Sequence, residues 1–139
     1  MFYLTTEMSF DAAHFLKDYN GKCRNLHGHR WRVIAKIAKE ELEKAGQLRS
    51  MVIDFGDLKD ALKEVTDYFD HSLIYEKDSL KPKTLEALIE EEFVLREVPF
   101  RPTAEEFSRY FFNQLKNQGF PVKSLTVYET PGNCATYEE

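Results

Sequence analysis

The first fourteen residues, Met1-Phe-Tyr-Leu-Thr-Thr-Glu-Met-Ser-Phe-Asp-Ala-Ala-His14, indicate the architecture of this chain. Apolar residues fall mainly on even positions, whereas polar residues such as Glu7 and Asp11 fall on odd positions. A period of two predicts a β-strand with one buried face. Because His14 ends the apolar row, this strand is expected to carry an imidazole at its end.

A second strand is predicted from His27 to about Lys39, where alternate residues are again apolar. Its apolar face comprises Trp31, Val33, Ala35 and Ile37. Turn-forming residues between Lys17 and Leu26 separate the two strands, so the strands can pair as a hairpin. The charged stretch 40–49 is interpreted as a solvated connection, and 51–55 as a short extended piece ending at Gly56.

Two helices are predicted downstream. Apolar residues at three- and four-residue steps predict a helix over about Asp57–Phe69. Thr103 with Glu106 three residues later predicts a capping box at the start of a second helix, which Gly119 ends. The segment 83–97 is ambiguous, because it contains a short helical pattern and then a possible strand at 93–98.

Two final strands, 123–130 and about 134–138, are joined by the turn Pro131-Gly-Asn133. The order β-β-α-α-β-β predicts an α+β fold with an antiparallel sheet of about four strands and two main helices on one face. The open edges of such a sheet favour association of copies.

The chain has 139 residues, which predicts a single domain over 1–139. Its net charge of −5 argues against a general nucleic-acid binder. There is no apolar run long enough to span a membrane and no signal-peptide pattern, so no membrane association is expected. Two cysteines do not make a disulfide framework, which favours a cytoplasmic protein with reduced thiols.

The histidine pattern suggests a metal site. His27 and His29 are spaced i, i+2, so on a strand both side chains point to the same face. Pairing of the two N-terminal strands would add His14 from the facing strand. Three histidines with an open fourth position are typical of catalytic zinc. The alternative is that His27 and His29 are loop histidines with satisfied hydrogen bonds.

Cys23 lies in a basic stretch. Between residues 15 and 32 there are five basic residues and a single acid, Asp18. The basic residues are Lys17, Lys22, Arg24, Arg30 and Arg32. Positive neighbours favour the reactive thiolate, and the same charges can hold a phosphorylated substrate. Cys23 can also be a zinc ligand or an inert loop thiol, while Cys134 is interpreted as structural.

Three further sites carry weaker signals. The adjacent Asp70 and His71 can form a carboxylate-oriented imidazole, although such pairs are common by chance. Glu129 ends an apolar strand row, so it is either a carboxylate that binds a ligand with adjacent N–H donors or an exposed strand-end acid. Thr103 and Glu105 lie at a helix start, where capping and helix-dipole roles explain them.

Taken together, these motifs resemble the 6-pyruvoyl-tetrahydropterin synthase family over nearly the whole chain and in the right order. The motifs are His14, Cys23-Arg-Asn-Leu-His-Gly-His29, Val52-Ile-Asp-Phe-Gly56, Asp70-His71, Pro102-Thr-Ala-Glu105 and Tyr128-Glu-Thr-Pro131. The three residues between Cys23 and His27 resemble the bacterial 6-carboxy-5,6,7,8-tetrahydropterin synthase branch of queuosine biosynthesis.

The resemblance implies a tunnelling fold (T-fold) and a homohexamer built from two trimers, with active sites between subunits. It implies a lyase that converts 7,8-dihydroneopterin triphosphate to 6-carboxytetrahydropterin, acetaldehyde and triphosphate. His14, His27 and His29 match the family's Zn²⁺ ligands, and Cys23 matches its thiolate proton acceptor. Asp70 and His71 match the acid and imidazole that work with the thiolate. Glu129 matches the carboxylate that anchors the pterin, and Thr103 and Glu105 match the helix-start motif near it.

The chain departs from the family pattern in two places. Glu106 stands where an Asn is expected, and the stretch 72–100 is longer than expected. Two alternatives to the carboxy branch stay open. One is the pyruvoyl-forming branch of the same family, and the other is a zinc-stabilised binding module without catalysis.

Overall fold

A computed structural model describes all residues, 1–139. Two long strands, β1 (Phe2–His14) and β2 (His27–Lys39), form its centre with the predicted bounds. They pair antiparallel along their whole length, from Phe2 opposite Lys39 to His14 opposite His27. The even-numbered residues of β1 face the interior towards its C-terminal end, as the alternation predicts. The hairpin therefore delivers His14 and His27 to the same end of the sheet.

The sheet has six strands in the order β4-β3-β1-β2-β5-β6. The expected antiparallel set of β1, β2, β5 (Val122–Thr130) and β6 (Asn133–Glu138) is present. The α+β fold is confirmed, but the count of about four strands is wrong. β3 (Ser72–Glu76) joins β1 in parallel at Ala12 and Ala13, and β4 (Leu95–Val98) joins β3 in parallel. Their short length gives little periodicity to detect.

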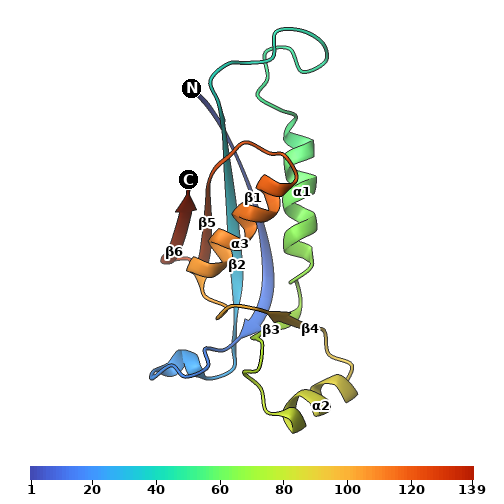
Figure 1. Cartoon of the computed structure of the whole chain (residues 1–139), viewed down its shortest axis with the longest axis vertical. Coiled ribbons are helices and arrows are strands. Elements are labelled where there is room, and N and C mark those ends of the chain that lie inside the picture. The colour runs from blue at the N-terminus through green and yellow to red at the C-terminus, as the bar shows by residue number, and fades with distance from the viewer.

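Helices α1 (Phe55–Asp67) and α3 (Ala104–Asn117) lie on one face of the sheet (Figure 1). α1 begins two residues earlier than expected, because the Asp54 carboxylate accepts a hydrogen bond from Gly56 N at 2.6 Å and caps the helix. The predicted capping box of α3 is half formed. Thr103 Oγ1 accepts from Glu106 N at 3.2 Å, but the Glu106 side chain pairs with Arg109 instead of reaching back.

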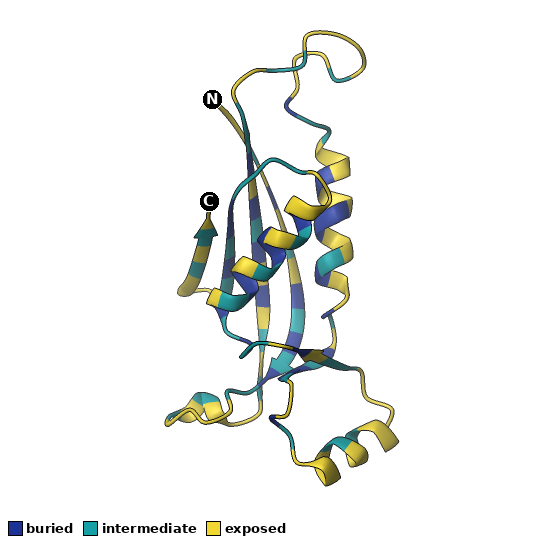
Figure 2. Ribbon diagram, viewed as in Figure 1, coloured by how far each residue is buried: buried dark blue, intermediate teal, exposed yellow.

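The long stretch 72–100 contains both elements that its sequence left open. A short helix, α2 (Pro82–Glu90), precedes β4, and no residue of α2 is buried. α2 stands apart from the sheet and is mostly exposed (Figure 2). The expected extended piece at 51–55 is not a strand, since Phe55 already begins α1. No helix in the fold is both long enough and apolar enough to cross a membrane.

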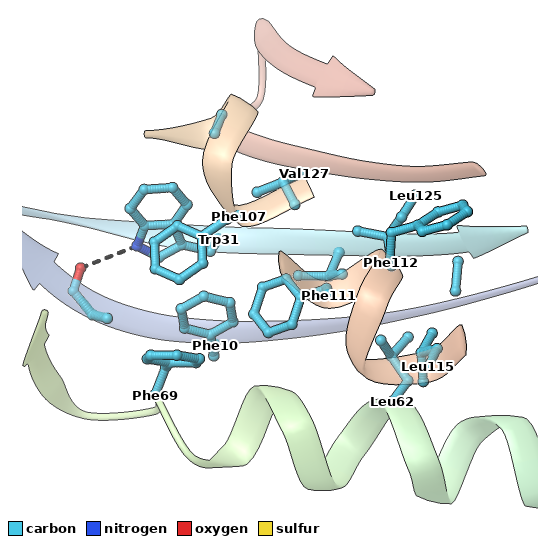
Figure 3. Packing of buried hydrophobic residues seen from close by; sticks show 14 of the residues in the cluster. Phe10, Trp31, Leu62, Phe69, Phe107, Phe111, Phe112, Leu115, Leu125 and Val127 are labelled. Atoms are coloured by element: carbon cyan, nitrogen blue, oxygen red, sulfur yellow. Dashed lines mark hydrogen bonds between the residues drawn. The ribbon is translucent and has the colours of Figure 1, made fainter. Parts of the chain in front are cut away.

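The core lies between the sheet and the two helices α1 and α3. Phe10 stacks on Trp31 with ring centroids 5.9 Å apart, and Phe107 and Phe111 of α3 pack edge-on against Phe10 (Figure 3). Phe69, just beyond the end of α1, is also buried in this cluster. This aromatic packing adjoins the end of the sheet at which the histidines gather.

Candidate metal centre

The end of β1, the start of β2 and the end of β5 lie towards the same end of the sheet (Figure 1). Four side chains converge there. They are His14, His27, His29 and Glu129. One potential ligand atom from each lies within 4.8 Å of all the others. The hairpin thus brings the three imidazoles together as the sequence predicts, and β5 adds Glu129 as a fourth member.

Backbone carbonyls fix the orientation of two of these imidazoles. His14 Nδ1 lies 2.8 Å from the Pro102 carbonyl oxygen, and His27 Nδ1 lies 2.6 Å from that of Asn25. A carbonyl only accepts, so each Nδ1 donates, and in the neutral ring Nε2 then holds a lone pair. The two Nε2 atoms lie 3.1 Å apart. Two lone pairs at this distance need a cation between them.

Glu129 and His29 bring two more potential ligand atoms to the same point. Glu129 Oε1 lies 3.1 Å from His14 Nε2 and 3.3 Å from His29 Nε2. His29 Nε2 is buried and makes no hydrogen bond. A single shared proton can bridge only two of these acceptors, whereas a metal ion can bind all of them. The donor set therefore fits a metal ion.

The protonation states also suit a metal. Burial lowers the pKa of His29, which favours the neutral imidazole. The hydrogen bond that His14 donates to Glu129 when its ring carries a second proton lowers the pKa of Glu129, which favours the carboxylate. Metal ligands must be deprotonated in this way. Imidazole nitrogen with a carboxylate oxygen is a ligand set that suits zinc among the divalent transition metals.

The surrounding structure holds the cluster in place. The register of β5 against β6 shifts between Tyr128 and Thr130, so Glu129 sits at a β-bulge, a feature that re-aims side chains near functional sites. Trp31 lies edge-on to His14, with centroids 4.8 Å apart, and edge-on to His29 at 5.5 Å. The Trp31 indole is itself held by a 3.3 Å hydrogen bond to the Ala12 carbonyl (Figure 3).

A pocket of about 390 Å³ adjoins the cluster. Its lining includes His29 and Glu129 together with Arg30, Arg32 and Tyr128. The guanidinium of Arg32 stacks over the Tyr128 ring at 4.3 Å. The pocket therefore gives a small polar molecule access to two members of the cluster.

Cys23 lies in η1 (Lys22–Arg24), a single 3₁₀ turn in the connection between β1 and β2. It is half-buried and free, and its carbonyl accepts a hydrogen bond from Leu16 N. Its sulfur is not among the atoms that converge in the cluster. The role of Cys23 as a thiolate stays a prediction. Cys134 is an exposed, free thiol in β6, and its interpretation as structural stays a prediction.

Asp70 and His71 form a pair beside β1 rather than within the cluster. Asp70 Oδ2 lies 2.8 Å from His71 Nδ1, and Asp70 Oδ1 accepts from Asp11 N at 2.9 Å. The Asp70 carboxylate raises the pKa of His71, and the Asp11 amide lowers the pKa of Asp70. His71 has a φ of 55°, which is uncommon for a residue with a side chain and is frequent at functional sites.

The helix-start residues take structural positions. The Thr103 hydroxyl caps α3, which confirms the capping role expected from the sequence. Glu105 is exposed and lines a separate hollow with Arg109 and Tyr137. Neither belongs to the four-residue cluster. Their contact with a ligand stays a prediction.

Sequence reasoning missed the groups that orient the ligands. The Pro102 and Asn25 carbonyls carry no side-chain signal, because any residue could supply them. Asp11 holds both Asp70, through its amide, and Arg30, through its carboxylate at 3.0 Å. The only available signal for Asp11 was its position three residues before His14 on the polar face of the strand.

Comparisons with known proteins identify the family of this chain. A family model described as 6-pyruvoyl tetrahydropterin synthase matches residues 3–139. The chain is 39% identical to a 6-carboxy-5,6,7,8-tetrahydropterin synthase of Haemophilus influenzae over 100% of both chains. It is 35% identical to one from Synechocystis sp., covering 99% of this chain and 93% of that one.

Solved structures share the fold. An uncharacterized protein of Wolinella succinogenes superposes with a TM-score of 0.84 at 22% identity, over 99% of this chain and 98% of that one. The 6-pyruvoyl tetrahydropterin synthase of Caenorhabditis elegans gives a TM-score of 0.68 at 27% identity, over 100% and 97% of the two chains. The family expected from the sequence motifs is thus confirmed: the chain belongs to the 6-pyruvoyl tetrahydropterin synthase family.

Proposed function

We propose that this protein is a zinc-dependent lyase that converts 7,8-dihydroneopterin triphosphate to 6-carboxy-5,6,7,8-tetrahydropterin, acetaldehyde and triphosphate. The observation that carries the proposal is the convergence of four acceptor atoms from His14, His27, His29 and Glu129. Relatives that are 35–39% identical over nearly their whole length bear the 6-carboxy name, which favours this branch over the pyruvoyl-forming one. The pathway would be queuosine biosynthesis.

In this proposal His14, His27 and His29 hold the zinc ion. When bound, zinc supplies Lewis-acid polarisation of hydroxyls on the pterin side chain. Glu129 lies beside the three ligands, but we assign it to the pterin and leave the fourth zinc position open. Its carboxylate can accept from the adjacent N–H donors of the amino-pyrimidine edge. Its position in the pocket beside His29 supports that role. Thr103 and Glu105 are assigned to pterin binding on the family resemblance alone, since neither lines that pocket.

Proton transfer is assigned to Cys23, Asp70 and His71. Cys23, in the 3₁₀ turn between β1 and β2, is assigned as the acceptor of a substrate proton, as the family resemblance implies. Asp70 accepts from His71 Nδ1, which leaves Nε2 free to exchange a proton with substrate. The raised pKa of His71 keeps a larger fraction protonated near neutral pH, so His71 suits the role of general acid.

Association would complete the site. β3 pairs with β1 only at Ala12 and Ala13, so the rest of that β1 edge and the outer edge of β6 carry no partner strand. Open edges of this length favour pairing with other copies. We assign the homohexamer of two trimers that the family resemblance implies, in the cytoplasm, with His71 facing a neighbouring copy.

The test is product identification by mass spectrometry after incubation with 7,8-dihydroneopterin triphosphate. Acetaldehyde together with 6-carboxytetrahydropterin is the expected outcome. Triphosphate release with a pyruvoyl product instead would assign the pyruvoyl-forming activity. Metal-loaded protein that binds the pterin but yields neither product would indicate a binding module and overturn the proposal.

A further inference from the structure

A second pocket, of about 340 Å³, lies between the connection after β1 and the turn after β3. Its lining includes Lys17, Arg24, Tyr19 and Ser79, with Asp18 as the only acid. Arg24 directly follows Cys23 in η1, so the pocket adjoins the thiol assigned to proton transfer. Two cations against one carboxylate favour an anionic ligand.

Ser79 supplies an independent indication of a ligand. It is 8% exposed, and its Oγ makes no hydrogen bond. Only two buried side-chain polar atoms in the structure lack a partner, and the other is His29 Nε2 in the metal cluster. A buried hydroxyl without a partner is costly, so such groups call for an explanation such as a ligand. Beside Lys17 and Arg24, a free O–H donor suits a phosphate oxygen.

The pocket is connected to the metal cluster by both the backbone and a side chain. Lys17 follows His14 by three residues, so their Cα atoms lie within about 11 Å of each other. The Arg101 guanidinium donates to the Lys17 carbonyl, and the next residue, Pro102, accepts from His14 Nδ1. The pocket and the metal cluster are thus joined by short links, as a substrate that spans both would require.

We propose that this pocket binds the linear triphosphate group of the substrate, with Ser79 donating a hydrogen bond and Lys17 and Arg24 neutralising its charge. The inference rests on the proposed function and assigns a subsite to it. Ser79 lies in the stretch 72–100 that is longer than the family pattern suggests, which gives that stretch a role in substrate binding.

The first experiment measures binding of inorganic triphosphate to the metal-loaded, full-length protein by calorimetry. Ser79→Ala should weaken binding about tenfold, because a hydrogen bond to a charged group is lost. Arg24→Gln should weaken it at least as much and, being at an exposed position, should leave folding intact. Lys44→Ala, an exposed position in the 40–49 connection, is the charge-matched control and should bind like the unmodified protein.

The second measurement separates binding from chemistry. Inorganic triphosphate should inhibit turnover competitively, and Ser79→Ala should raise KM about as much as it weakens triphosphate binding, with little change in kcat. Unchanged triphosphate affinity in both variants, or noncompetitive inhibition, would overturn the subsite. If triphosphate binding follows the prediction but no carboxy product forms, the proposed function fails while the anion site stands.

Discussion

The metal cluster and the Asp70–His71 pair lie near the same end of the sheet, yet they differ in how complete they are within one chain. His14 is fully buried, and its ring and that of His27 are oriented by backbone carbonyls. The His71 side chain, in contrast, is 79% exposed, contacts only Asp70, and sits on a strained backbone.

The difference indicates two kinds of site. Buried, pre-oriented ligands can hold a metal in an isolated chain, because nothing needs to be ordered when the metal arrives. An exposed imidazole in a left-handed conformation is costly to maintain and is usually kept for a function that involves a further partner. The cluster should therefore bind metal within a single chain, whereas His71 should need a second copy of the chain to act in proton transfer.

The largest effect should come from His29→Ala. This change removes a metal ligand without touching the carbonyls that orient His14 and His27. Bound metal and turnover should be lost together, by more than the ~10–100-fold that loss of a mere orienting partner costs. Elemental analysis checks the metal, with His71→Ala as the control that should keep its full metal content. Equal metal content in His29→Ala and in the unmodified protein would show that His29 is not a metal ligand.

Cys23→Ala should come next. Because its sulfur lies outside the converging ligand atoms, the variant should retain metal and oligomeric state. Turnover should fall by about 10²–10⁴, the range for one proton-transfer group. Cys134→Ala, which removes the exposed thiol of β6, should be unaffected. If Cys23→Ala lost its metal, the thiol would be a ligand and the cluster would extend beyond the four residues.

Asp70→Asn should give a smaller effect that is visible by pH titration. The carboxylate raises the pKa of His71, so the variant should titrate His71 at lower pH in an NMR experiment. Stability from a raised histidine pKa is present below the unfolded value near 6.5 and is lost as pH rises through the folded pKa. Stability from the lowered Asp70 pKa is lost as pH falls through that folded value. An unchanged His71 titration would refute the pairing.

Thr103→Ala should have the smallest effect, seen in stability rather than in metal content. Loss of the cap on α3 should cost about 1 kcal/mol in urea unfolding, because Glu106 N loses its acceptor. Thr103→Ser should keep most of that stability. Metal content should stay the same, since Pro102 holds His14 through its carbonyl. A drop in metal content would show that the cap and the metal site are one unit.

The elements with a regular alternation of apolar and polar residues could be predicted from the sequence. The alternation of β1 and β2 predicted the hairpin with its bounds, and the hairpin put His14 opposite His27. β3 could not be predicted, because five residues carry too little periodicity. Its parallel pairing with β1 joins residues that are about 60 positions apart in the sequence.

Within the site, residue types could be predicted but their orientation could not. The carbonyls of Pro102 and Asn25 leave no trace in the sequence, although they decide which imidazole nitrogen is free. The bulge at Glu129 also depends on the pairing of β5 with β6. The sequence alone therefore could not show that Glu129 in β5 lies beside the histidines of β1 and β2.

If the four-residue cluster is a metal centre, turnover depends on the metal that it holds. The most direct test removes metal with a chelator, adds Zn²⁺ back in known amounts, and measures acetaldehyde formed from 7,8-dihydroneopterin triphosphate. We expect no turnover without metal and a linear rise that ends at about one Zn²⁺ per chain. Full turnover by the metal-free protein, or full restoration of turnover by Zn²⁺ in the His29→Ala variant, would show that the cluster is not the metal centre.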